Sequence, residues 1–149
     1  MPAEPVPFDL HSAREAFATT GRLQAEATRL GARELGPKDF DRLRAADAEY
    51  TRALADARVE DAIAADDAFH QVLLDAAGDP DLQVSLDLLL PRLKRMDLYV
   101  FAQKTLVRGE SSHPAIIAAL EAGDAEGAAR LVENSYAAAG AALAAAIER

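Results

Sequence analysis

The sequence predicts an all-α protein, an antiparallel bundle of six or seven helices that forms a single domain over residues 1–149. Ala, Leu, Glu, Asp and Arg are abundant, aromatic residues make up only 5% of the chain, and Trp is absent. Such a composition is typical of helices rather than of strands built from β-branched residues. Apolar residues recur every three or four positions, and Gly and Pro interrupt this pattern at short intervals, which predicts helices joined by short connections.

Proline and glycine delimit the first three helices. Prolines keep the start of the chain extended, and the first helix should run from about Asp9 to about Gly31. The pair Gly36-Pro37 separates it from the second helix, which Pro37 opens. The third helix should run from about Glu60 to Ala77, because the run Gly78-Asp79-Pro80 ends it.

The second half of the chain contains the most apolar helix and the most Ala-rich one. The apolar helix should span residues 80 to about 106, with a kink at Pro91, which removes a backbone donor and crowds the preceding turn. Residues 108–112 are expected to form a loop with a capping serine before a short helix that ends near Leu120. The pair Gly123-Asp124 then begins the Ala-rich helix, which should reach almost to the last residue.

The charge and the missing residue types exclude several functions. Lys and Arg total 16 against 25 Asp and Glu, a formal net charge of −9, so we expect no direct binding to nucleic acid. Without Cys there is no disulfide, thiolate zinc site or cysteine nucleophile. The sequence has no signal peptide, no apolar run of membrane-spanning length, no Gly-rich phosphate loop and no G-x-S-x-G or H-E-x-x-H motif. We therefore expect a cytoplasmic protein without membrane contact.

Asp66, His70 and His113 are candidate metal ligands. Asp66 and His70 lie four residues apart in the expected third helix, so their side chains share a face and could bind one ion. His113 stands at the start of the expected short helix and could add a second imidazole. A simpler interpretation is that Asp66 orients a partly buried His70 and that His113 is exposed in a loop.

Two stretches around these residues resemble a known family. Residues 66–70, DDAFH, followed by residues 76–82, AAGDPDL, resemble the pattern D-x-x-F-H then A-A-G-N-x-x-L. Residues 112–124, SHPAIIAALEAGD, resemble the pattern E-H-x-x-I-x-x-A-L-x-x-G-D. Both patterns belong to the FadR C-terminal domain, or FCD, of GntR-family transcriptional regulators. Across nearly the whole chain, the resemblance implies a helical domain that binds an effector and dimerises.

The resemblance also implies a metal ion in the bundle that helps to hold a small organic acid. The ligands would be Asp66, His70 and His113, and the ion would be divalent zinc, nickel or iron. The family commonly adds another histidine in the last helix, at a position that Ser135 occupies here, beside Asn134. The site is therefore a weaker metal site, a more open and catalytic one, or none.

Several other residues are candidates for ligand and dimer contacts. Arg14 corresponds to an arginine usual in the family's first helix and could pair with an effector carboxylate, as could Arg92. The alternative, which is favoured for Arg92, is that each is solvated or pairs with one of the many acidic residues. Ser135 and Asn134 are candidate ligand contacts. A homodimer surface could involve the Leu88-Leu89-Leu90 run or the Ala-rich segment 136–147, unless these residues are simply core.

The leading functional hypothesis is an effector-binding and dimerisation domain of a GntR/FadR-type regulator that senses an organic acid. The family's winged helix-turn-helix is not in this sequence, so the chain would be either a regulator fragment or a standalone relative. The alternative is a standalone metal-dependent enzyme that uses Asp66, His70 and His113 as a two-histidine, one-carboxylate site. A third interpretation is a metal-free helical interaction module.

Overall fold

The computed structural model describes residues 9–102 and 111–147, and it is helical almost throughout. These residues contain six α-helices, one short 3-10 helix (η1) and no strand, which confirms the all-α prediction. The expected end of the fourth helix near residue 106, most of the loop at 108–112 and the end of the chain lie outside the described residues. The elements are α1 (Leu10–Gly31), η1 (Ala32–Glu34), α2 (Pro37–Ala55), α3 (Val59–Ala77), α4 (Pro80–Ala102), α5 (His113–Glu121) and α6 (Ala125–Ile147).

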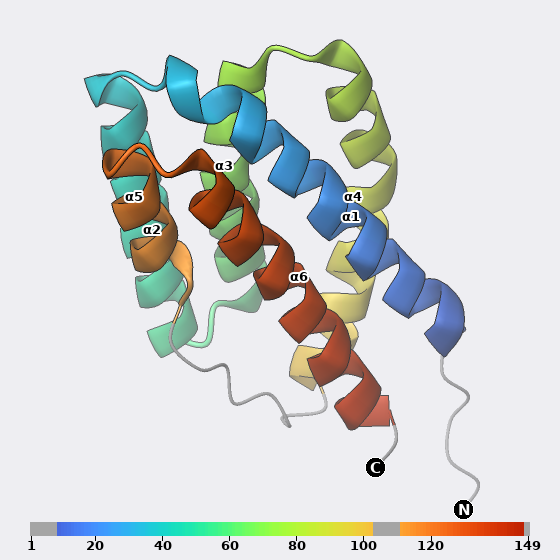
Figure 1. Ribbon diagram of the computed structural model, residues 1–149. Coiled ribbons are helices and arrows are strands. Elements are labelled where there is room, and N and C mark those ends of the chain that lie inside the picture. Colours follow the sequence, from blue (N-terminus) through green and yellow to red (C-terminus); the bar gives the residue numbers. More distant parts are fainter. Residues whose placement is uncertain (1–8, 103–110, 148–149) are drawn as a thin grey trace, which may run out of the picture.

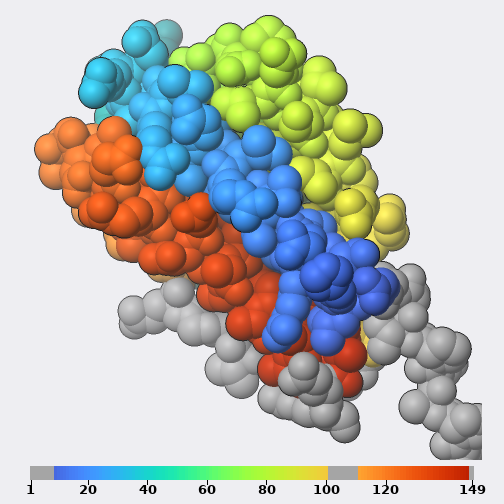
Figure 2. Space-filling model, turned by 45° about the vertical axis from the view of Figure 1, so that its right-hand side comes forward, coloured from blue at the N-terminus to red at the C-terminus, as the bar shows by residue number. Residues whose placement is uncertain are grey.

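The helices alternate in direction along the chain and form an antiparallel bundle (Figure 1). Helix α1 packs against α3, α4 and α6, whereas α2 packs against α3 and α5. Figure 2 shows α1 lying along one face of the molecule, with α4 on one side and α6 on the other. This arrangement places α3 and the start of α5 in the interior, where the candidate metal ligands are found.

Capping residues in the sequence determine where several helices begin and end. Asp9 accepts a hydrogen bond from the backbone N–H of Ser12 at 2.9 Å and so caps α1. Asp79 and Asp124 accept equivalent bonds at the starts of α4 and α6. Gly78 ends α3 with φ +63°, a left-handed conformation that suits glycine. These boundaries agree with the expected ones to within a residue or two.

Two local expectations are refined by the structure. Ser112 occupies the N-cap position of α5 but makes no capping bond with its side chain, whereas the Ser111 hydroxyl accepts a hydrogen bond from the His113 N–H at 3.1 Å. Helix α4 continues through Pro91, which is exposed, so the missing N–H lies on the solvent side and does not end the helix. The expected kink at this proline stays a prediction.

Helices α1 and α6 approach each other closely because glycine stands at two of their contacts. A Cβ atom on Gly21 would lie 3.0 Å from the Cβ of Tyr136, and one on Gly140 would lie 3.2 Å from the Cβ of Phe17. Both distances are tighter than ordinary van der Waals contact, so a side chain at either glycine would push the helices apart. The two glycines therefore set how deeply Phe17 and Tyr136 enter the bundle.

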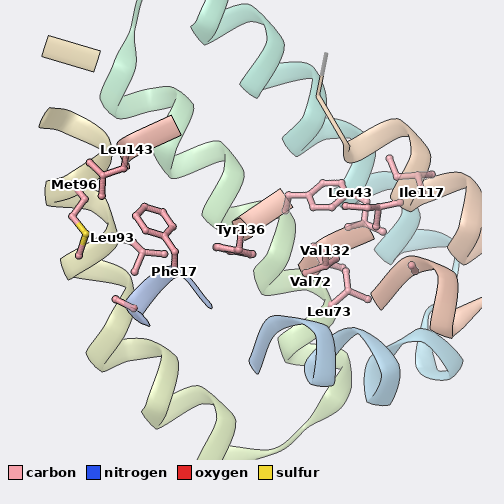
Figure 3. Packing of buried hydrophobic residues seen from close by; sticks show 14 of the residues in the cluster. Phe17, Leu43, Val72, Leu73, Leu93, Met96, Ile117, Val132, Tyr136 and Leu143 are labelled. Atoms are coloured by element: carbon pink, nitrogen blue, oxygen red, sulfur yellow. The ribbon is translucent and has the colours of Figure 1, made fainter. Parts of the chain in front are cut away.

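The main hydrophobic core runs along the inside of the bundle and includes both of these aromatic residues. In Figure 3, Phe17 lies near Leu93 and Met96, and Tyr136 lies between this group and a second group around Val132. In the Ala-rich segment expected at a dimer surface, Tyr136 and Leu143 are core residues, whereas Leu88 on α4 is 73% exposed. No helix in the described part of the chain has the length and apolar character needed to cross a membrane.

Candidate metal centre

Two helices bring three potential metal ligands together in the bundle interior. Asp66 and His70 lie one turn apart on α3, and His113 is the first residue of α5. An Asp66 carboxylate oxygen lies 2.8 Å from Nε2 of His113 and 3.5 Å from Nε2 of His70. Both histidines are buried, and Asp66 is partly buried. The structure thus brings together all three ligands expected from the sequence.

The geometry of this cluster is compatible with a single metal ion. One ligand atom from each residue lies within 4.8 Å of the other two. Nitrogen and oxygen ligands bind zinc at about 2.0–2.2 Å, which places any two ligand atoms roughly 3–3.5 Å apart. Small changes in the side-chain torsion angles would therefore allow all three ligand atoms to bind one ion. Two imidazoles and one carboxylate are a donor set that suits zinc, nickel or iron.

The ring of His113 is held from several sides. Phe69 stacks on it with ring centroids 4.0 Å apart and 12° between the planes, and the Tyr50 ring lies 4.9 Å away. The Nδ1 atom of His113 lies 3.1 Å from a carboxylate oxygen of Asp47 on α2. Asp47 therefore favours a proton on Nδ1, and Nε2 is left to face Asp66.

The environment of Asp66 favours its ionised form. Burial alone would raise the pKa of this carboxyl. The neighbouring His70 and His113 rings outweigh burial and hold the pKa well below its ordinary value. Asp66 is therefore ready to act as a carboxylate ligand at any pH near neutrality.

A cavity of about 340 Å³ adjoins the cluster, with Asp66 and His113 in its wall. It is lined mainly by α3, α4 and α6 and has an apolar part around Phe17 and Leu93. The Tyr136 hydroxyl is buried and has no hydrogen-bond partner among the described residues. Burial, together with nearby carboxylates such as Asp66, raises the pKa of Tyr136 well above its ordinary value, so the hydroxyl keeps its proton.

A second carboxyl, Asp67, lines the cavity beside Asp66. Burial raises its pKa to about 7, and the nearby carboxylates of Asp66 and Asp97 add to the rise. His70 and Lys94 oppose this shift without cancelling it. Asp67 is thus a poorly neutralised acid in the wall of the cavity.

The other residues expected in the site lie in different places. Ser135 lines the cavity. Asn134, Arg14 and Arg92 are exposed and do not line it. The ligand-binding roles of Arg14, Arg92, Asn134 and Ser135 stay predictions.

Sequence reasoning missed several residues of the site. Tyr136 directly follows Ser135 and Asp67 directly follows Asp66, so neighbours of the motif positions could have drawn attention to both. Lys94 belongs to neither motif, yet it lines the cavity. Asp47 lies in no motif, and only the packing of α2 against α5 brings it to His113.

These features define a helical domain in which a cluster of potential metal ligands adjoins a cavity. The chain matches the FCD domain family over residues 15–138, and it therefore belongs to this family. No curated protein matches it.

We expect Asp67→Asn to stabilise the metal-free protein at pH 8 but not at pH 4. In the folded protein Asp67 binds its proton up to about pH 7, whereas in the unfolded chain it ionises near its ordinary pKa of 3.8. Wild-type stability should therefore fall as the pH rises from about 4 to 7, and Asn removes this loss, worth on the order of 2 kcal/mol at pH 8. Urea unfolding with a chelator present measures the effect. Asp41→Asn, at an exposed position on α2, is the control, and an equal effect at both pH values would contradict the expectation.

We expect Asp47→Ala to weaken metal binding about tenfold or more, because carboxylates that orient a ligating histidine have effects of that size. Competition with a chromophoric chelator measures the affinity. Asp41→Ala, on the same helix but exposed, should leave it unchanged. An affinity for Asp47→Ala equal to that of the wild type would show that Asp47 does not orient His113.

Proposed function

We propose that the chain is the effector-binding and dimerisation domain of a GntR/FadR-type transcriptional regulator, and that it senses a small organic acid. The observation that carries this proposal is the Asp66–His70–His113 cluster beside a cavity of about 340 Å³. Membership of the FCD domain family supports it. DNA binding would belong to a separate winged helix-turn-helix domain.

In this proposal Asp66, His70 and His113 hold a divalent metal ion. The ion would supply positive charge and open coordination positions for the effector carboxylate. Asp47 accepts a hydrogen bond from the proton on Nδ1 of His113, so that Nε2 would offer its lone pair to the ion. The stacked ring of Phe69 limits rotation of His113.

Effector binding would act through the helices that line the cavity. Residues on α1, α3, α4 and α6 share its wall, so an occupant that fills the cavity would lie between these helices. If the helices have two arrangements, the effector stabilises the one it binds more tightly and shifts the population towards it. The alternative of a metal-dependent enzyme would use the same three ligands, and it stays a prediction.

The first test is elemental analysis of the purified protein and three variants. The wild type should hold about one metal ion per chain, and His70→Ala and His113→Ala should lose it because each removes a ligand. His11→Ala changes an exposed histidine on α1 and should keep the metal. Adding a panel of small carboxylates to the metal-loaded protein should raise its melting temperature. A wild type without metal after reconstitution, or with a melting temperature that no carboxylate changes, would contradict the proposal.

The proposal also includes a homodimer, for which α4 offers exposed apolar residues. Val84 and Leu88 lie one turn apart on this helix and are 60% and 73% exposed. We expect Leu88→Glu to convert a dimer to a monomer in light scattering coupled to gel filtration, because the charge would be buried at the interface. Leu30→Glu, at an exposed position on α1, is the control. A monomeric wild type would refute the dimer.

A further inference from the structure

Helix α4 carries a stripe of exposed residues, formed by Asp81, Val84, Leu88 and Arg95. Val84 and Leu88 are 60% and 73% exposed, and Asp81 and Arg95 are exposed as well. Asp81 lies seven residues before Leu88, and Arg95 lies seven residues after it. Because seven residues are almost two helical turns, the side chains project from the same side of α4. This α4 stripe therefore has an acid at one end, apolar residues in the middle and a base at the other end.

The two charged ends of the α4 stripe have no partner in the described part of the chain. The side chains of Asp81 and Arg95 form no ion pair and no hydrogen bond with a described residue. Arginines on other helices differ, since Arg29, Arg42 and Arg44 each bind a carboxylate on a neighbouring helix. An apolar centre between polar ends is the usual composition of a protein interface.

A second copy of the α4 stripe matches the first when the two helices run antiparallel. A twofold axis at Leu88 places this residue against its own copy. Asp81 and Arg95 each lie about 10.5 Å from Leu88 along the helix, so Asp81 lies beside the partner's Arg95, and the same pair forms at both ends. If the helices cross at about 20°, they diverge by only roughly 4 Å at this distance, which an arginine side chain can span.

The charges of the α4 stripe also select the orientation of the two helices. In a parallel pair Asp81 would face its own copy, and so would Arg95, and both contacts would be repulsive. In the antiparallel pair Val84 faces the partner's Arg92, whose carbon chain can cover the valine. A partner with a uniformly acidic or basic surface would meet a like charge at one end. A second copy of this chain supplies both charges at the required spacing.

We propose that the α4 stripe is a twofold-symmetric interface in which the α4 helices of two copies pack antiparallel around Leu88, and each Asp81 pairs with the partner's Arg95. This assignment rests on the homodimer in the proposed function and specifies its surface, orientation and charge contacts. Another side of α4 lines the cavity through Leu93 and Val100. The same helix would thus contact both the occupant of the cavity and the partner, so that a shift of α4 would move the interface.

Charge-reversal variants test both the surface and the orientation. Asp81→Arg would place two bases together at each end of the interface, and Arg95→Asp would place two acids together. Each variant alone should weaken the dimer by about tenfold or more in sedimentation equilibrium at low salt, where exposed charges are least screened. The double variant restores opposite charges at both ends without changing the net charge. Its dissociation constant should return to within about threefold of the wild-type value.

An equal mixture of the two single variants is the most specific test. One variant then supplies both bases and the other both acids, so that opposite charges meet at both ends. The mixture should dimerise nearly as tightly as the wild type, although each variant alone dimerises weakly. This rescue requires that Asp81 meets the partner's Arg95. Asp41→Arg, at an exposed position on α2, is the control and should leave the dimer unchanged. Circular dichroism verifies that each variant is folded.

The outcomes separate this inference from the proposed function. If neither single variant weakens a dimeric wild type, the α4 interface is wrong and the dimer forms through another face. Weak single variants that are rescued neither by mixing nor by the double substitution would overturn the antiparallel pairing. A monomeric wild type would overturn both the interface and the homodimer. None of these results would alter the tests of metal and carboxylate binding.

Discussion

The burial of one imidazole, that of His113, is the constraint on which the rest of the structure depends. A buried ring with two polar nitrogens needs partners for both, and here they come from two other helices, Asp47 on α2 and Asp66 on α3. Because His113 is the first residue of α5, satisfying its ring also fixes where that helix begins. Phe69 then covers one face of the ring. The contacts that hold the start of α5 in the bundle are therefore the same contacts that orient a candidate metal ligand.

Much of the fold could be predicted from the sequence because its signals are local. Asp9, Asp79 and Asp124 cap helices within three residues of their own positions, and Gly78 ends α3 through its own backbone conformation. The pair formed by Asp66 and His70 was predictable for the same reason, since helical spacing alone puts both on one face. Asp47, which lies 66 residues before His113, was not predictable, because no local pattern records a contact between helices.

Two adjacent acids illustrate how packing gives neighbouring residues different chemistry. Asp66 faces two imidazoles and ionises readily, whereas Asp67 faces the cavity and other carboxylates and holds its proton up to about pH 7. The positive charge expected beside an effector carboxylate comes from a different residue than the sequence suggested. Arg14, the arginine expected to fill this role, is exposed on α1, whereas Lys94 on α4 is the base in the described wall. A motif position fixes a residue type, whereas the balance of charge in a cavity depends on all the helices around it.

The close crossing of α1 and α6 is the point about which α1 would tilt. At this crossing Gly21 packs against Tyr136, and Gly140 packs against Phe17. Both aromatic side chains also line the cavity. Because glycine has no side chain that could change its rotamer, a shift of either aromatic residue would move the neighbouring helix. Gly21 lies near the middle of the 22-residue α1, about 16 Å from its first residue at 1.5 Å of rise per residue. A tilt of about 5° at the crossing would therefore swing Leu10 by roughly 1.4 Å. Phe17, which lines the cavity, lies on this same N-terminal half of α1, so a change in the position of its side chain would be carried to the start of the helix.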